Sequence, residues 1–85
     1  MAKVEIYTRM MCGFCDSAKA LLDKKGVAYD EIDVTFDPAA REVMVMRADG
    51  RNTTPQIFIG GTGVGGSDDI YALDREGRLD AMLKA

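Results

Sequence analysis

The 85-residue sequence contains no histidine and only two cysteines, and these scarcities exclude several classes of protein. A structural zinc site needs about four ligands, usually cysteine or histidine, so this chain does not build one alone. The longest unbroken apolar runs are a few residues long, as at residues 43–46, which excludes a membrane-spanning helix. The first seven residues alternate polar and apolar side chains instead of forming the continuous apolar stretch of a secretory signal. We therefore expect a cytoplasmic protein.

A dominant charge of one sign is also absent. The net charge is −3, from 11 basic and 14 acidic residues that are interspersed along the chain. No basic stripe with interleaved aromatic residues is present, which argues against nucleic acid as the main partner. A chain of this length has no room for a second hydrophobic core, so we expect a single domain spanning residues 1–85.

The two cysteines that are present, Cys12 and Cys15, lie between an apolar strand-like run and an amphipathic helix-like run. A C-x-x-C sequence at such a turn is typical of a thioredoxin-like redox pair. A cysteine at a helix N-cap faces unpaired N–H groups and the positive end of the helix dipole, which favour the thiolate. Because the thiolate is the nucleophile, and C-x-x-C motifs lower the pKa below about 8.5, we predict Cys12 as the nucleophile. Cys15, one helical turn later, is the predicted resolving thiol.

Two simpler interpretations of the pair are weaker. A structural disulfide that closes so short a loop removes little entropy from the unfolded chain. Two inert core cysteines are also a poor explanation, because the pair flanks Gly13 at a helix start. The redox interpretation is therefore favoured.

The periodicity of the first half predicts a strand, a helix, a second strand and a second helix. The first strand covers residues 3–7, the first helix runs from Cys12 to a stop at Gly26, and the second strand covers residues 27–34. Asp37 and Pro38 start the second helix, which ends near residues 49–50. Its inward-facing residues are predicted to be Val43 and Met44, with Met46 as a further candidate; packing explains these methionines better than a soft metal site.

The second half predicts two short strands and a last helix. Residues 57–59 and 62–64, joined by a Gly-Gly turn, should form a hairpin. Ser67 or Asp68 is the expected N-cap of the next helix, which ends at Gly77, and residues 79–83 add a terminal helical turn or two. The order β-α-β-α-β-β-α predicts an α/β protein whose four-stranded mixed sheet is flanked by helices.

Several segments, which together span essentially the whole chain, resemble the glutaredoxins of the small bacterial type. They are Val4-Glu5-Ile6-Tyr7-Thr8, Cys12-x-x-Cys15, Ala18-Lys19-Ala20-Leu21-Leu22, the stretch from Thr54-Pro55 to Gly61, and Gly65-Gly66-Ser67-Asp68-Asp69. The resemblance implies a thioredoxin-like fold and a glutathione-dependent thiol–disulfide oxidoreductase. Its implied partners are glutathione and proteins that are glutathionylated or disulfide-bonded, with the protein acting as a monomer.

A glutathione site is expected where the last helix begins. The backbone N–H groups of Ser67 and Asp68 offer an anion site for the γ-glutamyl carboxylate. Gly66 lets a ligand backbone approach closely. The Asp68 side chain is a candidate acceptor for the ligand ammonium; a plain N-cap is the alternative, and the two roles are compatible.

Two further segments are expected to complete this site. Arg9, which lies where the resemblance places a basic residue, is the first candidate to bind the glycyl carboxylate, and Arg51 is the second. Each is alternatively a solvated surface charge. Thr54-Pro55 resembles the family's cis-proline pair, and a cis bond there would let the Thr54 backbone pair with glutathione as an added strand does.

The active-site sequence also departs from the resemblance. Dithiol members usually read Cys-Pro-Tyr-Cys, whereas Cys12-Gly13-Phe14 is what members with a single active-site cysteine carry. Those members are associated with [2Fe–2S] clusters held by two protomers and two glutathiones. In addition, Thr54 stands where valine is usual, and Ser67 where many relatives have cysteine. An iron–sulfur carrier, with Cys12 as a ligand only in a cluster-bridged dimer, therefore remains the alternative function.

Overall fold

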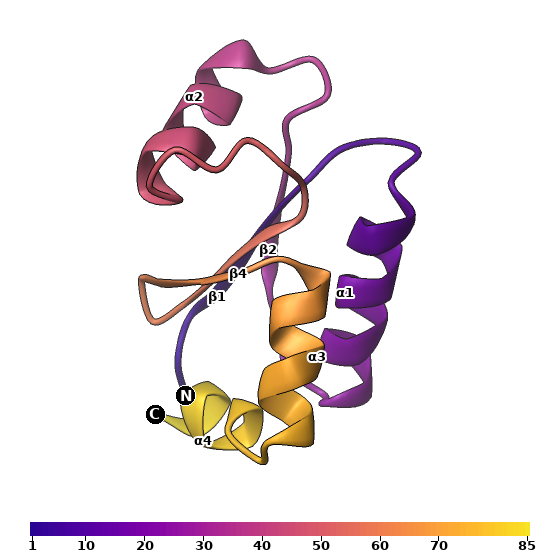
Figure 1. Cartoon of the computed structure of the whole chain (residues 1–85), viewed down its shortest axis with the longest axis vertical. Helices are drawn as coiled ribbons and strands as arrows, with labels where there is room; N and C mark the ends of the chain where they lie inside the picture. Colours follow the sequence, from indigo (N-terminus) through magenta and orange to yellow (C-terminus); the bar gives the residue numbers. More distant parts are fainter.

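The computed structural model describes all residues, 1–85, and contains four strands and four helices (Figure 1). In chain order they are β1 (Val4–Thr8), α1 (Gly13–Lys24), β2 (Asp30–Asp33), α2 (Pro38–Arg47), β3 (Gln56–Ile59), β4 (Thr62–Gly65), α3 (Ser67–Arg75) and α4 (Leu79–Lys84). The sheet order is β2-β1-β3-β4, with β1 parallel to β2, and with β3 antiparallel to both β1 and β4. The predicted four-stranded mixed sheet is confirmed.

Helices cover both faces of the sheet, because alternate strand residues point to opposite faces (Figure 1). The larger core cluster joins the strands to α1, α3 and α4, and the smaller joins them to α2. Ile57 and Ile59 of β3 belong to the larger cluster, whereas Phe58 between them packs with Met44 in the smaller one. All four residues of β3 are buried, as expected for a central strand. None of the helices combines the length and apolarity that crossing a bilayer requires.

The inward face of α2 is narrower than predicted. Met44 is fully buried, but Val43 and Met46 are 47% and 74% exposed, so the prediction that they pack inward is wrong. The residues that pack on Tyr7 and Phe58 recur at helical i, i+4 spacing, namely Ala40, Met44 and Ala48, with Val45 beside them. Since α2 buries only this stripe, the flanking apolar residues turn to solvent.

The predicted N-cap at Cys12 is confirmed, because helix α1 begins at Gly13. Two other boundaries differ from the prediction. Strand β2 is shorter than residues 27–34, because only Asp30–Asp33 pair with β1. The N-cap of α3 is Gly66, not Ser67 or Asp68, because the Asp69 carboxylate accepts a hydrogen bond from the Gly66 N–H at 2.8 Å.

Candidate functional site

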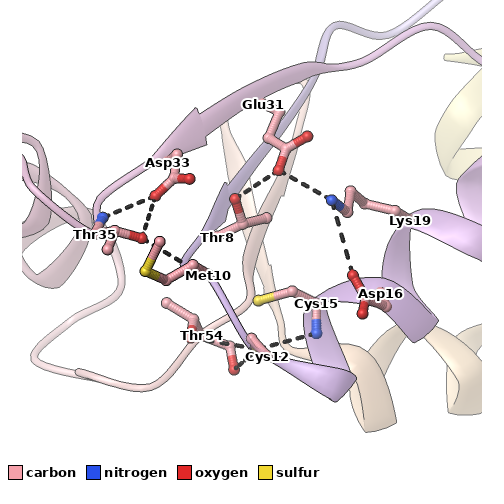
Figure 2. Close-up of polar contacts among 10 residues, drawn as sticks. All are labelled: Thr8, Met10, Cys12, Cys15, Asp16, Lys19, Glu31, Asp33, Thr35 and Thr54. Atoms are coloured by element: carbon pink, nitrogen blue, oxygen red, sulfur yellow. Dashed lines mark hydrogen bonds and ion pairs between the residues drawn. The ribbon is translucent and has the colours of Figure 1, made fainter.

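The two cysteines have different surroundings at the start of α1 (Figure 2). Cys12 has extended backbone angles, and its sulfur accepts a hydrogen bond from the Cys15 N–H at 3.1 Å. Both thiols are free, but Cys12 is 8% exposed and Cys15 only 1%. Both residues are thus buried, but Cys12, whose side chain caps the helix, is the less covered of the two.

The environment shifts the two thiol pKa values in opposite directions. Burial raises the pKa of Cys12, but hydrogen bonds from Cys15 and Thr54 and the charge of Arg9 outweigh it, so the pKa lies below its ordinary value. Burial, together with the hydrogen bond to the Cys12 sulfur, raises the pKa of Cys15. The two shifts therefore favour ionisation of the Cys12 thiol over that of the Cys15 thiol beside it.

Thr54 connects the thiol to a neighbouring cavity. The Cys12 sulfur lies 3.8 Å from the Thr54 carbonyl oxygen and 3.7 Å from its hydroxyl. The Thr54–Pro55 peptide bond is cis, as the resemblance implied. Both residues line a cavity of about 460 Å³, in which the structure brings together every residue predicted for the ligand site: Arg9, Arg51, Thr54, Pro55, Gly66, Ser67 and Asp68. Residues that sequence reasoning missed also line it: Phe14, Arg41, Asn52, Thr53 and Asp69.

The three arginines of the cavity differ in whether their guanidinium groups pair with a carboxylate. The guanidinium of Arg51 forms an ion pair with Asp69 at 3.3 Å. Arg9 donates from Nε to the Thr54 hydroxyl at 3.1 Å, and Arg41 donates to the side-chain and backbone oxygens of Asn52 at 3.0 and 3.1 Å. Because neither Arg9 nor Arg41 pairs with a carboxylate, both keep positive charge available for an anionic ligand.

Helix α3 points its N-terminus at the same cavity. The N–H groups of Ser67 and Asp68 stand in the first turn, where a helix offers no carbonyl partner. Gly65 precedes them with φ of +98°, and a Cβ there would overlap the Asp69 carboxylate, so the turn requires glycine. Thus the local sequence itself leaves unpaired N–H donors open to the cavity.

Among the cavity residues that were missed, some follow a recognisable sequence pattern and others do not. Asp69, three residues after the glycine at the N-cap, follows the capping-box spacing and was recognisable. Arg41 gave no local signal, because it lies on α2 and reaches the cavity only through the packing of α2 beside residues 51–54.

The comparisons with known proteins all identify members of one family. A family model described as Glutaredoxin matches residues 4–64. The chain is 52% identical over 84 residues to Glutaredoxin 3 of Escherichia coli (strain K12), covering 99% of this chain and 100% of the relative. The solution structure of glutaredoxin from Brucella melitensis is similar with a TM-score of 0.86 and 55% identity, covering 99% of this chain and 90% of the other. The crystal structure of a buckwheat glutaredoxin–glutathione complex is similar with a TM-score of 0.86 and 30% identity, covering 98% and 77%.

Proposed function

The chain belongs to the glutaredoxin family of glutathione-dependent thiol–disulfide oxidoreductases, and we propose that it reduces glutathione mixed disulfides and protein disulfides through Cys12. The observation that carries this proposal is the contrast between the two thiols. Cys12 is the less covered thiol and has the lowered pKa, and Cys15 is the more covered thiol and has the raised pKa. An attacking thiolate and a reserve thiol one helical turn apart are what the two-step reaction requires.

With a glutathionylated protein, the Cys12 thiolate attacks the glutathione sulfur of the mixed disulfide. The bond between that sulfur and the protein sulfur breaks, the protein thiolate leaves and takes a proton, and glutathione is left on Cys12. A second glutathione, as its thiolate, then attacks the sulfur of the bound glutathione. This step releases glutathione disulfide and regenerates the Cys12 thiolate.

With a protein disulfide, the Cys12 thiolate attacks one of the two substrate sulfurs and forms a mixed disulfide with it. The substrate disulfide breaks, and the other substrate sulfur leaves as a thiolate and takes a proton. Cys15 then loses its proton and attacks the Cys12 sulfur, which releases the second substrate thiol and leaves a Cys12–Cys15 disulfide. Two glutathiones reduce this disulfide in turn, so the electrons come from glutathione in both reactions. The cytoplasm, where glutathione keeps thiols reduced, is the compartment that suits this chemistry.

We assign the cavity beside Cys12 to glutathione, because its charges match the ligand. The N–H groups of Ser67 and Asp68 suit the γ-glutamyl carboxylate, and the Asp68 carboxylate suits the adjacent ammonium. Arg9 is the first candidate for the glycyl carboxylate, with Arg41 beside it, and Arg51 is second because Asp69 already pairs with it. Thr54, Pro55 and Gly66 form the wall along which the cysteinyl backbone would lie. The existence of a glutathione complex among the similar structures supports this assignment.

Single-cysteine variants test the proposed roles. Cys12→Ser should abolish transfer from both a glutathionylated peptide and a protein disulfide. Cys15→Ser should retain removal of glutathione from the peptide and lose most reduction of the protein disulfide. Ser17→Ala, at an exposed position on α1, is the matched control. Equal loss in the two cysteine variants would refute the division of roles.

A second candidate function, carrying a [2Fe–2S] cluster, is favoured by Gly13. A Cβ at Gly13 would have no neighbouring heavy atom within 4 Å, so a second protomer meets little obstruction beside Cys12. No group of three or more His, Cys, Asp and Glu side chains in the chain is placed to hold a metal ion. The resemblance to the single-cysteine members implies that the four ligands of such a cluster would be Cys12 of two protomers and two glutathione thiols.

Anaerobic reconstitution with iron, sulfide and glutathione tests the cluster function. The expected result is a visible absorbance that coelutes with a dimer on a sizing column and disappears in air or when glutathione is removed. Gly13→Pro, which restricts the turn, should reduce the yield. A colourless monomer in both proteins would leave the oxidoreductase function alone.

A further inference from the structure

The loop between β1 and α1 is attached to the end of β2 by a short hydrogen-bond relay (Figure 2). The Met10 N–H donates to the Thr35 hydroxyl oxygen at 2.8 Å. That hydroxyl donates in turn to Asp33 Oδ1, which also accepts from the Thr35 N–H at 2.8 Å. A hydroxyl has one hydrogen and two lone pairs, so the bond to Asp33 directs an acceptor lone pair toward Met10.

This relay acts on a segment with few other restraints. Met10 and Met11 lie outside the helices and strands, and neither takes part in a backbone–backbone hydrogen bond. Met11 has φ of +54°, in the left-handed region that side chains disfavour, and its side chain is 99% exposed. Because Met11 gains no support from packing, its conformation must be maintained by contacts on either side of it.

Those contacts are the relay before Met11 and the helix cap after it. On the far side, the Cys12 sulfur accepts from the Cys15 N–H. The turn at Met11 therefore joins two hydrogen bonds, one that attaches the loop to β2 and one that orients the reactive sulfur at the start of α1.

We propose that Thr35, oriented by Asp33, is a positioning residue for Cys12: it holds the Met10 amide, and through the left-handed turn at Met11 it aligns the sulfur with the helix N-terminus. The hydrogen bond from the Thr35 hydroxyl lowers the pKa of Asp33, so the acceptor that anchors the relay stays ionised at neutral pH. The inference rests on the proposed role of Cys12 as the nucleophile, and it adds a residue that does not touch the substrate.

The test compares Thr35→Val, which removes the hydroxyl and keeps the shape, with Thr35→Ser, which retains the hydroxyl. Thr62→Val, at an exposed threonine of β4, is the matched control. Three quantities are measured: hydrogen exchange of the Met10 amide, the rate constant for alkylation of Cys12 by iodoacetamide in a Cys15→Ser background, and kcat and KM with a glutathionylated peptide.

In Thr35→Val, we expect exchange at Met10 to be about tenfold faster, as for the loss of one hydrogen bond. Alkylation of Cys12 and kcat should both fall severalfold, while KM for glutathione changes less than kcat. Thr35→Ser should restore all of these values, and Thr62→Val should leave them unaltered. Rescue by serine distinguishes positioning from a general loss of stability.

Unchanged alkylation and kcat in Thr35→Val would overturn the proposal, as would failure of serine to restore them. If Thr35→Val does not fold, Asp33→Asn weakens the same relay and is judged by the same three measurements. If Cys12 of the unaltered protein reacts no faster than Cys15, the proposed function fails instead, so the two failures are distinguishable.

Discussion

At the scale of single residues, Cys12 and Cys15 have the same side chain, but their positions shift their pKa values in opposite directions. A cysteine at an N-cap receives N–H groups, whereas a cysteine one turn into the helix is covered by its neighbours. Arg9 adds to the difference, because its charge lowers the pKa of Cys12. The difference follows from where the helix begins, not from the residue type.

The lowered pKa of Cys12 predicts the pH dependence of its alkylation. In a Cys15→Ser background, the rate should rise with pH and reach its midpoint below about 8.5, the value of an ordinary cysteine. Arg9→Ala should move this midpoint to higher pH, since a positive charge near the thiolate is lost. Arg75→Ala, at an exposed residue in the last turn of α3, should leave the midpoint in place. A midpoint at or above the ordinary value in the unaltered protein would contradict the assignment.

Arg47 forms the polar contacts between α2 and the sheet. It donates to the Glu5 carboxylate at 2.9 Å and to the Tyr7 hydroxyl at 2.9 Å, and its guanidinium lies 4.0 Å from the centroid of the Phe58 ring. The hydrogen bond from Arg47 lowers the pKa of Glu5 despite the opposing effect of burial. A group with a lowered pKa stabilises the fold above its unfolded pKa, here about 4.3, and the stabilisation is lost as the pH falls through the folded value.

We therefore predict a pH-dependent effect of Glu5→Gln on the free energy of unfolding. At pH 7 the variant should be less stable by about 1 kcal/mol, because a charge-assisted bond becomes a neutral one. The difference should shrink as the pH falls below about 4 and vanish once Glu5 is protonated. Urea unfolding at several pH values measures it, with Glu42→Gln on the exposed surface of α2 as control. A difference independent of pH would contradict this account.

At the scale of elements, the start of α3 combines a structural and a ligand-facing carboxylate in neighbouring residues. Asp69 caps the helix by accepting from the Gly66 N–H, and it also pairs with Arg51. Asp68 forms no ion pair or side-chain hydrogen bond in the chain and lines the cavity. Two adjacent acidic residues thus have different surroundings, because successive helical side chains point about 100° apart, and we propose separate functions for them.

Alanine variants should separate these two functions. Asp69→Ala should lower the free energy of unfolding by about 1 kcal/mol, the usual effect of losing a helix cap. Asp68→Ala should leave unfolding nearly unchanged and raise KM for glutathione, since the proposed partner of the ligand ammonium is lost. Thermal unfolding and steady-state kinetics on both variants provide the test. A stability loss in Asp68→Ala equal to that in Asp69→Ala would contradict the assignment.

At the scale of the whole molecule, positive side chains are concentrated in one place although the chain is acidic overall. The net charge is −3, yet three arginines line one cavity. Asp68 and Asp69 line the same cavity, so its side chains carry one net positive charge, whereas the exposed edge strand β2 has Asp30, Glu31 and Asp33 in four residues. A small anionic ligand therefore meets a local positive field on an acidic protein.

This arrangement predicts that salt weakens glutathione binding. Raising the ionic strength should raise KM for glutathione, because exposed charges are screened over about 8–10 Å. Arg9→Ala should raise KM at low salt and reduce its dependence on salt. Arg78→Ala, whose arginine lies outside the cavity, should keep the dependence of the unaltered protein. If KM is independent of salt and of Arg9, the assigned binding site is misplaced.

Features that depend on a few neighbouring residues could be predicted from the sequence. Helix capping, turn formation and strand alternation act over one to five positions, so the N-cap at Cys12, the start at Asp37-Pro38 and the hairpin around Gly60-Gly61 were all predictable. Seven of the twelve cavity residues were predicted as well, from the family resemblance and from the helix start at residues 66–68, whereas Phe14, Arg41, Asn52, Thr53 and Asp69 were not. Sequence patterns predicted a feature correctly where the residues that determine it are close together in the chain.

Contacts between distant residues, in contrast, depend on how the helices and strands pack. Parallel pairing of β1 with β2 brings Thr35 to the Met10 amide, 25 residues away, and the packing of α2 brings Arg41 to Asn52 at the cavity. The same packing determines that Met44 is buried while Met46 faces solvent. No local period encodes these contacts, because each depends on the angle and register at which complete elements pack against the sheet.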